Sequence, residues 1–422
     1  MKKIVFLCLI SLAISLQAQF NEHFKNKTLR VDYIHSGSAE VEYFVFDTLF
    51  TEKYWGGSKT NLIDEFDYGN HKFEVYDALT NELLYSRGFS SLFREYQATP
   101  EGKTSCKSFD ETVVMPYPKH AVNIVFYSRN KDLSWEKMYI LPVDPKTRKI
   151  RKNKQMKFNK QKVHYAGKPN EKLDIVIIAE GYTIEEIDKF REDCERFKGY
   201  ILDAEPYNEN LDKINIWAVE AISEESGTDL PGEDIWKNTA AGTNFYTFDS
   251  ERYLTTEDMK SVRNIAANAP YDQIYILVNH EKYGGGGIYN YYSLGTSDNS
   301  AADFLFQHEF GHAFAGLGDE YYSSEVAVED FYPTNVEPWE PNITTRVDFG
   351  SKWENMMSSS TPVPTPPTKE YENTVGLFEG GGYVAKGVYR PYIDCTMKSV
   401  KYDAFCPVCK RAIQRMIDFY AE

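Results

Sequence analysis

The chain has 422 residues, of which 42% are hydrophobic, and it carries a formal net charge of −16 at pH 7. This length and apolar content suit two folded domains and exclude a mainly disordered chain, which could not bury enough apolar surface. The negative charge argues against nucleic acid as a partner, because nucleic-acid binding relies on clustered Lys and Arg.

Residues 1–18 have the pattern of a secretory signal peptide. A basic start precedes an apolar segment from Ile4 to Leu16, and Ala18 is a suitable cleavage residue. This segment is too short to span a bilayer, although an uncleaved anchor is the alternative. No later segment reads as a transmembrane helix, so none is expected in the mature chain. We therefore expect an exported protein that is periplasmic, at the cell surface or extracellular.

Residues 20–145 alternate apolar and polar side chains with the period of two that is typical of β-strands. The alternation is clear in segments 29–33, 41–45 and 122–126. Short strands separated by polar turns predict a β-sandwich-like accessory domain. It carries no catalytic motif, so it could bind a substrate or partner, or simply shield the rest of the chain.

Residues 146–170 mark the expected domain boundary, a basic linker. Within it, segment 146–162 carries nine Lys or Arg and no acidic residue. This composition predicts a solvated linker or an exposed edge strand. A protease-sensitive processing site is a further alternative.

Residues 171–422 have an α/β pattern. The apolar segments 173–179 and 274–278 predict buried strands. Four glycines, Gly284 to Gly287, follow the second of these segments. They predict either an edge strand with room for an extended peptide to pair along it, or a surface turn.

The most informative segment is His308-Glu309-Phe310-Gly311-His312. Residues four apart lie on one face of a helix, so both imidazoles can reach a single Zn²⁺ at about 2.0–2.1 Å. Glu309 can then take a proton from a metal-activated water. The alternative is a surface helix with two solvated histidines. Flanking phenylalanines favour burial instead, and a buried imidazole needs a partner or a metal.

The helical pattern ends at Gly316 and Gly318, which can adopt the positive φ of a sharp turn. Such a turn returns Asp319 and Glu320 towards the histidines, as in the metzincin pattern HExxHxxGxxH, but with an acid in place of the third His. Asp319 stands seven residues after His312 rather than six, so both acids remain candidates for the third ligand. We favour Asp319, whose shorter side chain is closer to the required position.

These motifs resemble the IgA peptidase family of zinc metallo-endopeptidases. Besides segment 308–321, segment 174–183 is similar to the strand and turn that open the family's catalytic domain, and segment 389–397 is similar to its downstream Met-containing segment. The resemblance implies a multidomain fold, with an N-terminal all-β sandwich-like domain followed by an α/β (α+β) metzincin-like zinc metallopeptidase domain over 171–422. It does not imply IgA as the substrate.

We therefore expect a secreted zinc metallo-endopeptidase that acts on a protein or peptide substrate. His308, His312 and Asp319 are expected to hold Zn²⁺ with a fourth position open to water, and Glu309 to act as general base.

Two further roles are implied by the same resemblance. Tyr389 is expected to donate a hydrogen bond to the tetrahedral intermediate, with a core position as the alternative. Met397 is expected to pack beneath the metal, with Met356-Met357 as its rival.

Five cysteines follow the predicted signal peptide, and an odd number leaves at least one free thiol. We expect Cys395 to pair with Cys406 or Cys409 in a disulfide that ties the Met-containing segment to the last helix. The single Cys406-Pro-Val-Cys409 motif is weak evidence for a zinc ribbon, which needs a second pair, or for a redox site.

Two other functions remain open. The chain could be a cell-surface binding or adhesion protein with a degenerate peptidase domain, or a zinc amidase that acts on glycopeptides or cell wall. The intact Glu309 argues against the first, because a scaffold has no need of a base.

Overall fold

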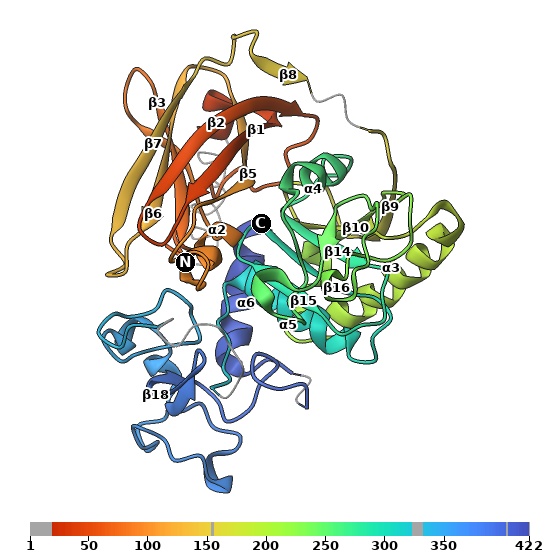
Figure 1. Cartoon of the computed structure of the whole chain (residues 1–422). Helices are drawn as coiled ribbons and strands as arrows, with labels where there is room; N and C mark the ends of the chain where they lie inside the picture. Colours follow the sequence, from red (N-terminus) through yellow and green to blue (C-terminus); the bar gives the residue numbers. More distant parts are fainter. Residues whose placement is uncertain (1–18, 153–155, 323–331, 402–403, 422) are drawn as a thin grey trace, which may run out of the picture.

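The computed structural model describes residues 19–152, 156–322, 332–401 and 404–421 (Figure 1). The predicted signal peptide, residues 1–18, lies outside the described residues. An N-terminal β-rich part, up to residue 152, lies beside an α/β part that begins at residue 159. A mixed architecture with a β-rich N-terminal region is therefore confirmed.

The N-terminal part contains two four-stranded sheets, with the orders β5-β1-β2-β8 and β4-β3-β6-β7. Its elements are β1 (Phe24–Gly37), β2 (Glu42–Glu52), β3 (His71–Asp77), β4 (Leu83–Phe89), α2 (Leu92–Ala98), β5 (Lys107–Pro118), β6 (Val122–Arg129), β7 (Trp135–Val143) and β8 (Ile150–Lys152). Side chains from both sheets, among them Val31 and Ile124, share one buried core. Two sheets that share an apolar layer form a sandwich-like unit.

At the start of β2 the buried face is the opposite of the one that the alternation suggested. Val41, Tyr43 and Val45 are 40%, 58% and 49% exposed, whereas Phe44 is 8% exposed. The Phe44 ring packs on Tyr33 at a centroid distance of 5.4 Å. Only one face of the strand can meet the core, and here the face with the large aromatic ring does so.

The α/β part is built on a six-stranded sheet with the order β15-β16-β14-β10-β11-β9. Its strands are β9 (Asn159–Tyr165), β10 (Leu173–Glu180), β11 (Ile214–Glu220), β12 (Thr243–Asn244), β13 (Thr255–Thr256), β14 (Gln273–Val278), β15 (Gly285–Ile288), β16 (Tyr292–Thr296), β17 (Phe378–Gly381) and β18 (Val384–Arg390), and its helices are α3 (Ile187–Leu202), α4 (Met259–Ala266), α5 (Ala302–Ala315) and α6 (Pro407–Tyr420). The four inner strands of the large sheet run parallel, and β9 and β15 are antiparallel edges.

Strand β9 comes from the segment predicted as a basic linker. It pairs with β11 at the edge of the large sheet, while β8 pairs with β2 in the sandwich. These residues are therefore edge strands, which was the second interpretation of the basic segment. Lysines on an edge strand, such as Lys160, discourage pairing with other chains.

Helices cover both faces of the large sheet. Helices α3, α5 and α6 pack with Ile175 and Ile177 of β10 on one face. Helix α4 packs with Val176 and Ile178 on the other. Successive strand residues point to opposite faces, so one continuous apolar strand supplies two cores. The buried strands predicted over 173–179 and 274–278 are confirmed.

Helix α2 joins the two parts of the molecule. It follows β4 of the sandwich, yet Phe93 and Tyr96 pack in the core beside α4. The Ser90 N–H donates to the Tyr289 carbonyl at 2.9 Å. The sandwich is therefore anchored to the α/β part by apolar contacts and main-chain hydrogen bonds.

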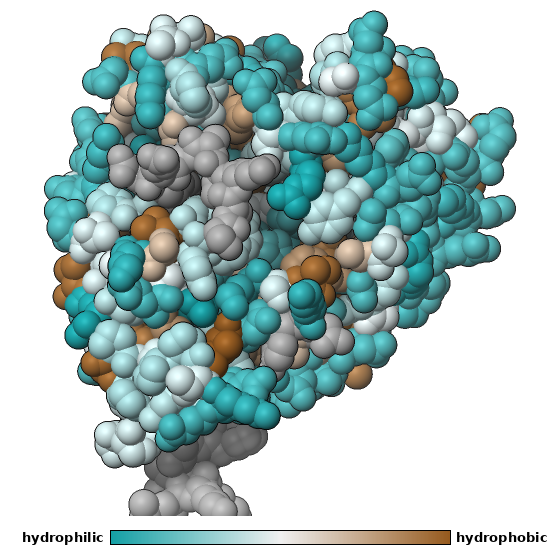
Figure 2. All heavy atoms as spheres, turned by 60° about the horizontal axis from the view of Figure 1, so that its bottom comes forward, coloured by the Kyte–Doolittle hydropathy of each residue, from teal (hydrophilic) through white to brown (hydrophobic). Residues whose placement is uncertain are grey.

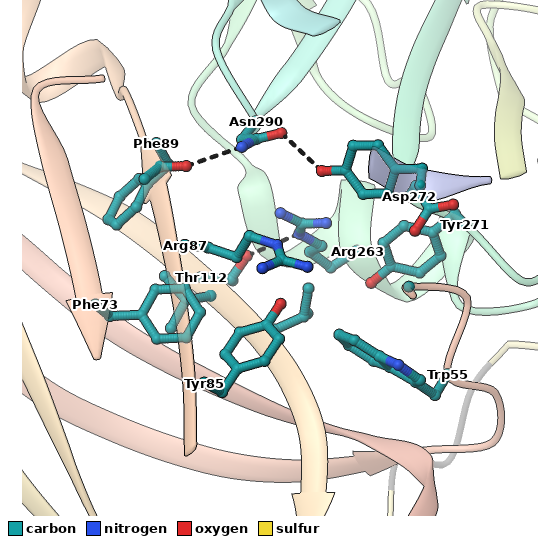
Figure 3. Close-up of a pocket in the computed structure, with 15 residues that line it drawn as sticks. Trp55, Phe73, Tyr85, Arg87, Phe89, Thr112, Arg263, Tyr271, Asp272 and Asn290 are labelled. Atoms are coloured by element: carbon teal, nitrogen blue, oxygen red, sulfur yellow. Dashed lines mark hydrogen bonds between the residues drawn. The ribbon is translucent and has the colours of Figure 1, made fainter. Parts of the chain in front are cut away.

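A cavity of about 60 Å³ lies between the two parts (Figure 3). Trp55, Tyr85 and Arg87 line it from the sandwich, and Tyr271 and Asn290 from the α/β part. Its lining contains no residue of the His308–His312 motif. It is a packing gap between domains rather than the site that the motif predicts.

The face of the molecule in Figure 2 is mainly hydrophilic, and its apolar residues form small, separate groups. Within the described ranges, no helix has the length and apolar character needed to cross a bilayer.

A buried ion network supports the contact between the sandwich and α4. Arg30, Asp32 and Glu52 are at most 2% exposed. The Arg30 guanidinium contacts Asp32 at 2.7 Å and donates to the Asn264 side chain of α4 at 2.8 Å. The network therefore crosses from β1 and β2 to the other part of the chain.

We predict that Arg30→Ala lowers the free energy of unfolding by about 3–5 kcal/mol, because it leaves two carboxylates buried without their cation. Urea denaturation measures the change. The exposed Arg148 is the control, and Arg148→Ala should change stability by no more than about 0.5 kcal/mol. Equal effects of the two substitutions would contradict the structural role of the network.

Candidate metal centre

The helix α5 carries the His308–His312 motif and lies very close to the edge strand β15. A Cβ atom on Gly287 would come within 2.1 Å of the Glu309 main-chain oxygen. Only glycine permits this approach. The glycine segment is an edge strand, as one interpretation predicted, but α5 fills the space that its glycines leave. On the outer side, Tyr253 pairs with Gly285, so the chain itself occupies part of the free edge.

The helix ends in the predicted glycine turn. Gly316 has φ 62° and ψ 28°, the left-handed conformation that glycine adopts without strain. The Gly316 N–H donates to the His312 carbonyl at 3.1 Å, and the Leu317 N–H to the Gly311 carbonyl at 3.2 Å. This ending satisfies main-chain carbonyls of the last turn and returns the chain towards the histidines.

Three potential ligand atoms meet at this turn. The Nε2 atoms of His308 and His312 are 3.1 Å apart, and the Asp319 Oδ1 atom lies 3.1 Å from the first and 3.3 Å from the second. In a tetrahedral site with bonds of about 2.0–2.1 Å, neighbouring ligand atoms are about 3.3–3.4 Å apart. The three atoms are therefore spaced as one face of a tetrahedral zinc site.

The other ring nitrogen of each histidine is held by the main chain. His308 Nδ1 lies 2.9 Å from the Thr396 carbonyl, and His312 Nδ1 lies 2.5 Å from the Leu317 carbonyl. A carbonyl can only accept, so each Nδ1 carries a proton, and in the neutral ring each Nε2 offers its lone pair to a metal ion. Both rings are thus oriented as ligands.

Asp319 is suited to a cation. Its buried Oδ1 atom faces the two histidine Nε2 atoms, and its Oδ2 atom accepts from the Tyr383 hydroxyl. Burial disfavours its charge, but the two histidines hold the pKa of Asp319 far below its usual value. Burial likewise opposes the charge of His312, and Asp319 raises the pKa of His312 to about 9. An ionised carboxylate with a free oxygen lone pair favours a bound metal ion.

Glu309 follows the first histidine and is half-buried. Burial of the carboxyl raises the pKa of Glu309, while the charges of His308 and His312 oppose the rise. A pKa closer to neutral makes a carboxylate a better proton acceptor at physiological pH.

Glu95 is a residue of this site that the sequence did not reveal. It lies on α2, and its carboxylate accepts from the Tyr253 hydroxyl at 2.6 Å. Burial raises the pKa of Glu95 to about 7, and the charges of His312 and Glu309 also act on it. The N-terminal part therefore contributes an acidic group beside the motif helix. Its sequence context offers no signal, because only the packing of α2 brings it here.

Met397 lies where the resemblance predicted, whereas Tyr389 lies in the core. Met397 is fully buried, and a Cβ atom on Gly311 would lie 2.9 Å from its Sδ atom, so it packs beneath the motif helix between the two histidines. Tyr389 lies in the core under the Arg346 guanidinium. Two other tyrosines contact Asp319: the Tyr383 hydroxyl donates to its Oδ2 atom, and Tyr321 also forms a side-chain hydrogen bond with it.

Glu320 points away from the histidines. Its side chain accepts from the Asn342 amide at 3.0 Å and from the Cys409 thiol at 3.3 Å.

The expected disulfide is absent: Cys395, Cys406 and Cys409 are free thiols, and the Cys395 and Cys409 sulfurs are 3.9 Å apart. A disulfide requires about 2.05 Å. The reason for the error is that a fourth side chain, Glu320, shares the space between the cysteines.

We predict that Glu95→Gln is more stabilising at pH 8 than at pH 5. The folded pKa of Glu95, about 7, lies above its ordinary value of 4.5. The folded state therefore loses stability as pH rises between these values, by no more than about 3 kcal/mol. The amide side chain of the Glu95→Gln variant does not ionise, so the variant does not lose this stability as the pH rises. Urea denaturation of the metal-free protein measures it, and a pH-independent difference would count against the buried position of Glu95.

Comparisons with known proteins identify the family of the chain. A family described as IgA Peptidase M64 matches residues 161–374 and 367–417. A second family, described as Peptidase M64 N-terminus, matches residues 19–140. No curated protein matches the chain. Because the matches cover most of the sequence, the chain belongs to the IgA peptidase M64 family, a family of peptidases.

Proposed function

We propose that this protein is an exported zinc metallo-endopeptidase with a metzincin-like catalytic domain. The observation that carries the proposal is the convergence of His308 Nε2, His312 Nε2 and Asp319 Oδ1 beside the carboxylate of Glu309. The membership in a peptidase family supplies the reaction class.

The donor set fits zinc rather than a harder cation. Two neutral imidazoles and one carboxylate are ligands of catalytic zinc, whereas Mg²⁺ and Ca²⁺ prefer all-oxygen sites. A zinc ion in this position would lower the pKa of a water molecule and polarise the carbonyl of the scissile peptide bond.

The side chains of the protein perform the remaining steps. Glu309 takes the proton from the attacking water and delivers it to the nitrogen of the leaving amine. Asp319 and the main-chain carbonyls of Thr396 and Leu317 keep the two imidazoles in their orientation. Tyr383 holds the second oxygen of Asp319.

The substrate is proposed to be an extended peptide beside β15. Strand β15 is an antiparallel edge of the sheet and lies against the motif helix. Backbone pairing with an edge strand is a common mode of peptide recognition. Tyr253 already pairs with Gly285, so the peptide would use the edge beyond this residue. Glu95, which accepts from the Tyr253 hydroxyl, adds an acidic group near this edge.

Export is proposed from the signal-peptide pattern of residues 1–18. N-terminal sequencing of the protein recovered outside the cytoplasm should begin close after Ala18. Recovery of the full-length chain only in the cytoplasm would contradict export.

We predict that the protein hydrolyses casein, that a chelator stops the reaction and that added Zn²⁺ restores it. His308→Ala and His312→Ala should each lose the metal ion of this site and the activity, because two remaining ligands hold zinc weakly. His120→Ala, which changes an exposed histidine, should keep both. Chelator-sensitive release of fragments from peptidoglycan, with no cleavage of casein, would favour the amidase alternative.

The second prediction separates metal binding from proton transfer. Glu309→Gln should keep one equivalent of catalytic zinc and lower kcat by at least about 10²-fold, the usual contribution of a general base. Asp303→Asn changes an exposed acid on the same helix and should leave kcat unchanged. A Glu309→Gln variant as active as the parent would exclude the proposed base.

The third prediction concerns the third ligand. Asp319→Asn replaces the carboxylate by an amide of similar shape, and its zinc affinity should fall by more than about 10-fold, because a charged ligand is lost. Tyr383→Phe removes only the hydroxyl that holds Asp319 and should have a smaller effect. Metal titration of both variants measures the difference. Undiminished zinc affinity in Asp319→Asn would mean that another residue is the third ligand.

A further inference from the structure

A second group of potential metal ligands lies behind the candidate metal centre. Ligand atoms of Glu320, Cys395, Cys406 and Cys409 all lie within 4.8 Å of one another. Each of the four residues is at most 2% exposed. They come from three places in the chain: the turn after α5, the segment after β18 and the first turn of α6. Such convergence of buried ligands from separate elements is typical of a structural site.

The spacing within this group is that of a tetrahedral thiolate site. The sulfurs of Cys395 and Cys409 are 3.9 Å apart, and the Cys409 sulfur lies 3.3 Å from Glu320 Oε1. With zinc–sulfur bonds of about 2.3 Å, two sulfur ligands are about 3.8 Å apart, and a sulfur and a carboxylate oxygen are about 3.5 Å apart. The observed separations need little adjustment to admit a metal ion.

The Glu320 carboxylate is an independent indication of a ligand. Its Oε2 atom is buried without a hydrogen-bond partner. A buried carboxylate oxygen without a donor is costly. Among the described groups around it, Asn342 and Cys409 contact only the other oxygen. A metal ion in the group would give Glu320 a positive partner.

The main chain also favours thiolates here. The Cys406 N–H donates to the Cys395 sulfur at 3.2 Å. Cys406 precedes the first turn of α6 and Cys409 lies within that turn, where the helix end stabilises negative charge. Three cysteines cannot all be consumed by one disulfide, whereas all three serve as ligands to a single ion.

We propose that Cys395, Cys406, Cys409 and Glu320 bind a second zinc ion with a structural role. Three sulfurs and one oxygen form a closed, four-coordinate set, and thiolates select zinc over Mg²⁺ and Ca²⁺. Unlike the histidine site, this set leaves no position for water. The proposal does not depend on the peptidase activity.

The second ion would support the first site through the main chain. Glu320 follows Asp319 directly, and its N–H donates to the Met397 carbonyl at 2.8 Å. Thr396, whose carbonyl orients His308, follows Cys395. A metal ion that fixes Glu320 and Cys395 would therefore fix the positions of Asp319 and His308.

Metal analysis of the purified full-length protein tests the proposal. The parent should contain about two zinc ions per chain, and Cys409→Ser and His312→Ala should each retain about one. The combined variant should retain none. Cys194→Ser changes a buried cysteine of α3 and should keep two. One zinc in the parent that is lost in His312→Ala and kept in Cys409→Ser would overturn the second site while leaving the proposed peptidase intact.

A second measurement covers the case in which Cys409→Ser does not fold. The His308→Ala/His312→Ala variant keeps all three cysteines, and its loading with Co²⁺ should produce the absorption bands of thiolate-to-cobalt charge transfer. Intact mass and thiol counting of the same sample report the competing disulfide. A chain two hydrogens lighter, with one free thiol among the three and no cobalt band, would disprove the second site.

Discussion

The geometry of the candidate site depends on two consecutive acids that face opposite directions. Asp319 contacts the two histidines, and Glu320 contacts the cysteine group. The Glu320 N–H, bonded to the Met397 carbonyl, anchors the chain between them. Adjacent residues of an extended segment point to opposite sides, so a single main-chain hydrogen bond helps place both side chains. The left-handed turn at Gly316 delivers the segment to this position.

Close packing between β15 and α5 is the second constraint on the site. Glycines in β15 let the strand approach the helix backbone to a distance that a Cβ atom would prevent. The same proximity brings the edge of the sheet next to the histidines. A peptide paired along this edge would therefore pass close to the proposed metal and to Glu309. The glycines would thus act on such a peptide indirectly, by setting the position of the strand.

The N-terminal part of the chain is anchored to the α/β part and contributes an acidic group beside β15. Helix α2 inserts aromatic side chains into the core of the α/β part and carries Glu95 to Tyr253, which pairs with β15. The buried Arg30 network and the cavity of Figure 3 lie along the same contact between domains. Because the two parts share buried contacts, the sandwich and the α/β part are held together beside the motif helix.

The sequence by itself determined the features that arise from local periodicity: the buried strands, the motif helix, the glycine turn and the shared direction of His308 and His312. These depend on residues only a few positions apart. Spacing favoured Asp319 and left Glu320 open, whereas the direction in which each acid faces depends on the distant Met397 carbonyl. For the same reason the sequence suggested a disulfide where Glu320 joins three thiols, and it did not single out Tyr383, which contacts Asp319. Only the tertiary structure brings such residues together, since packing between separate elements carries no signature in local sequence.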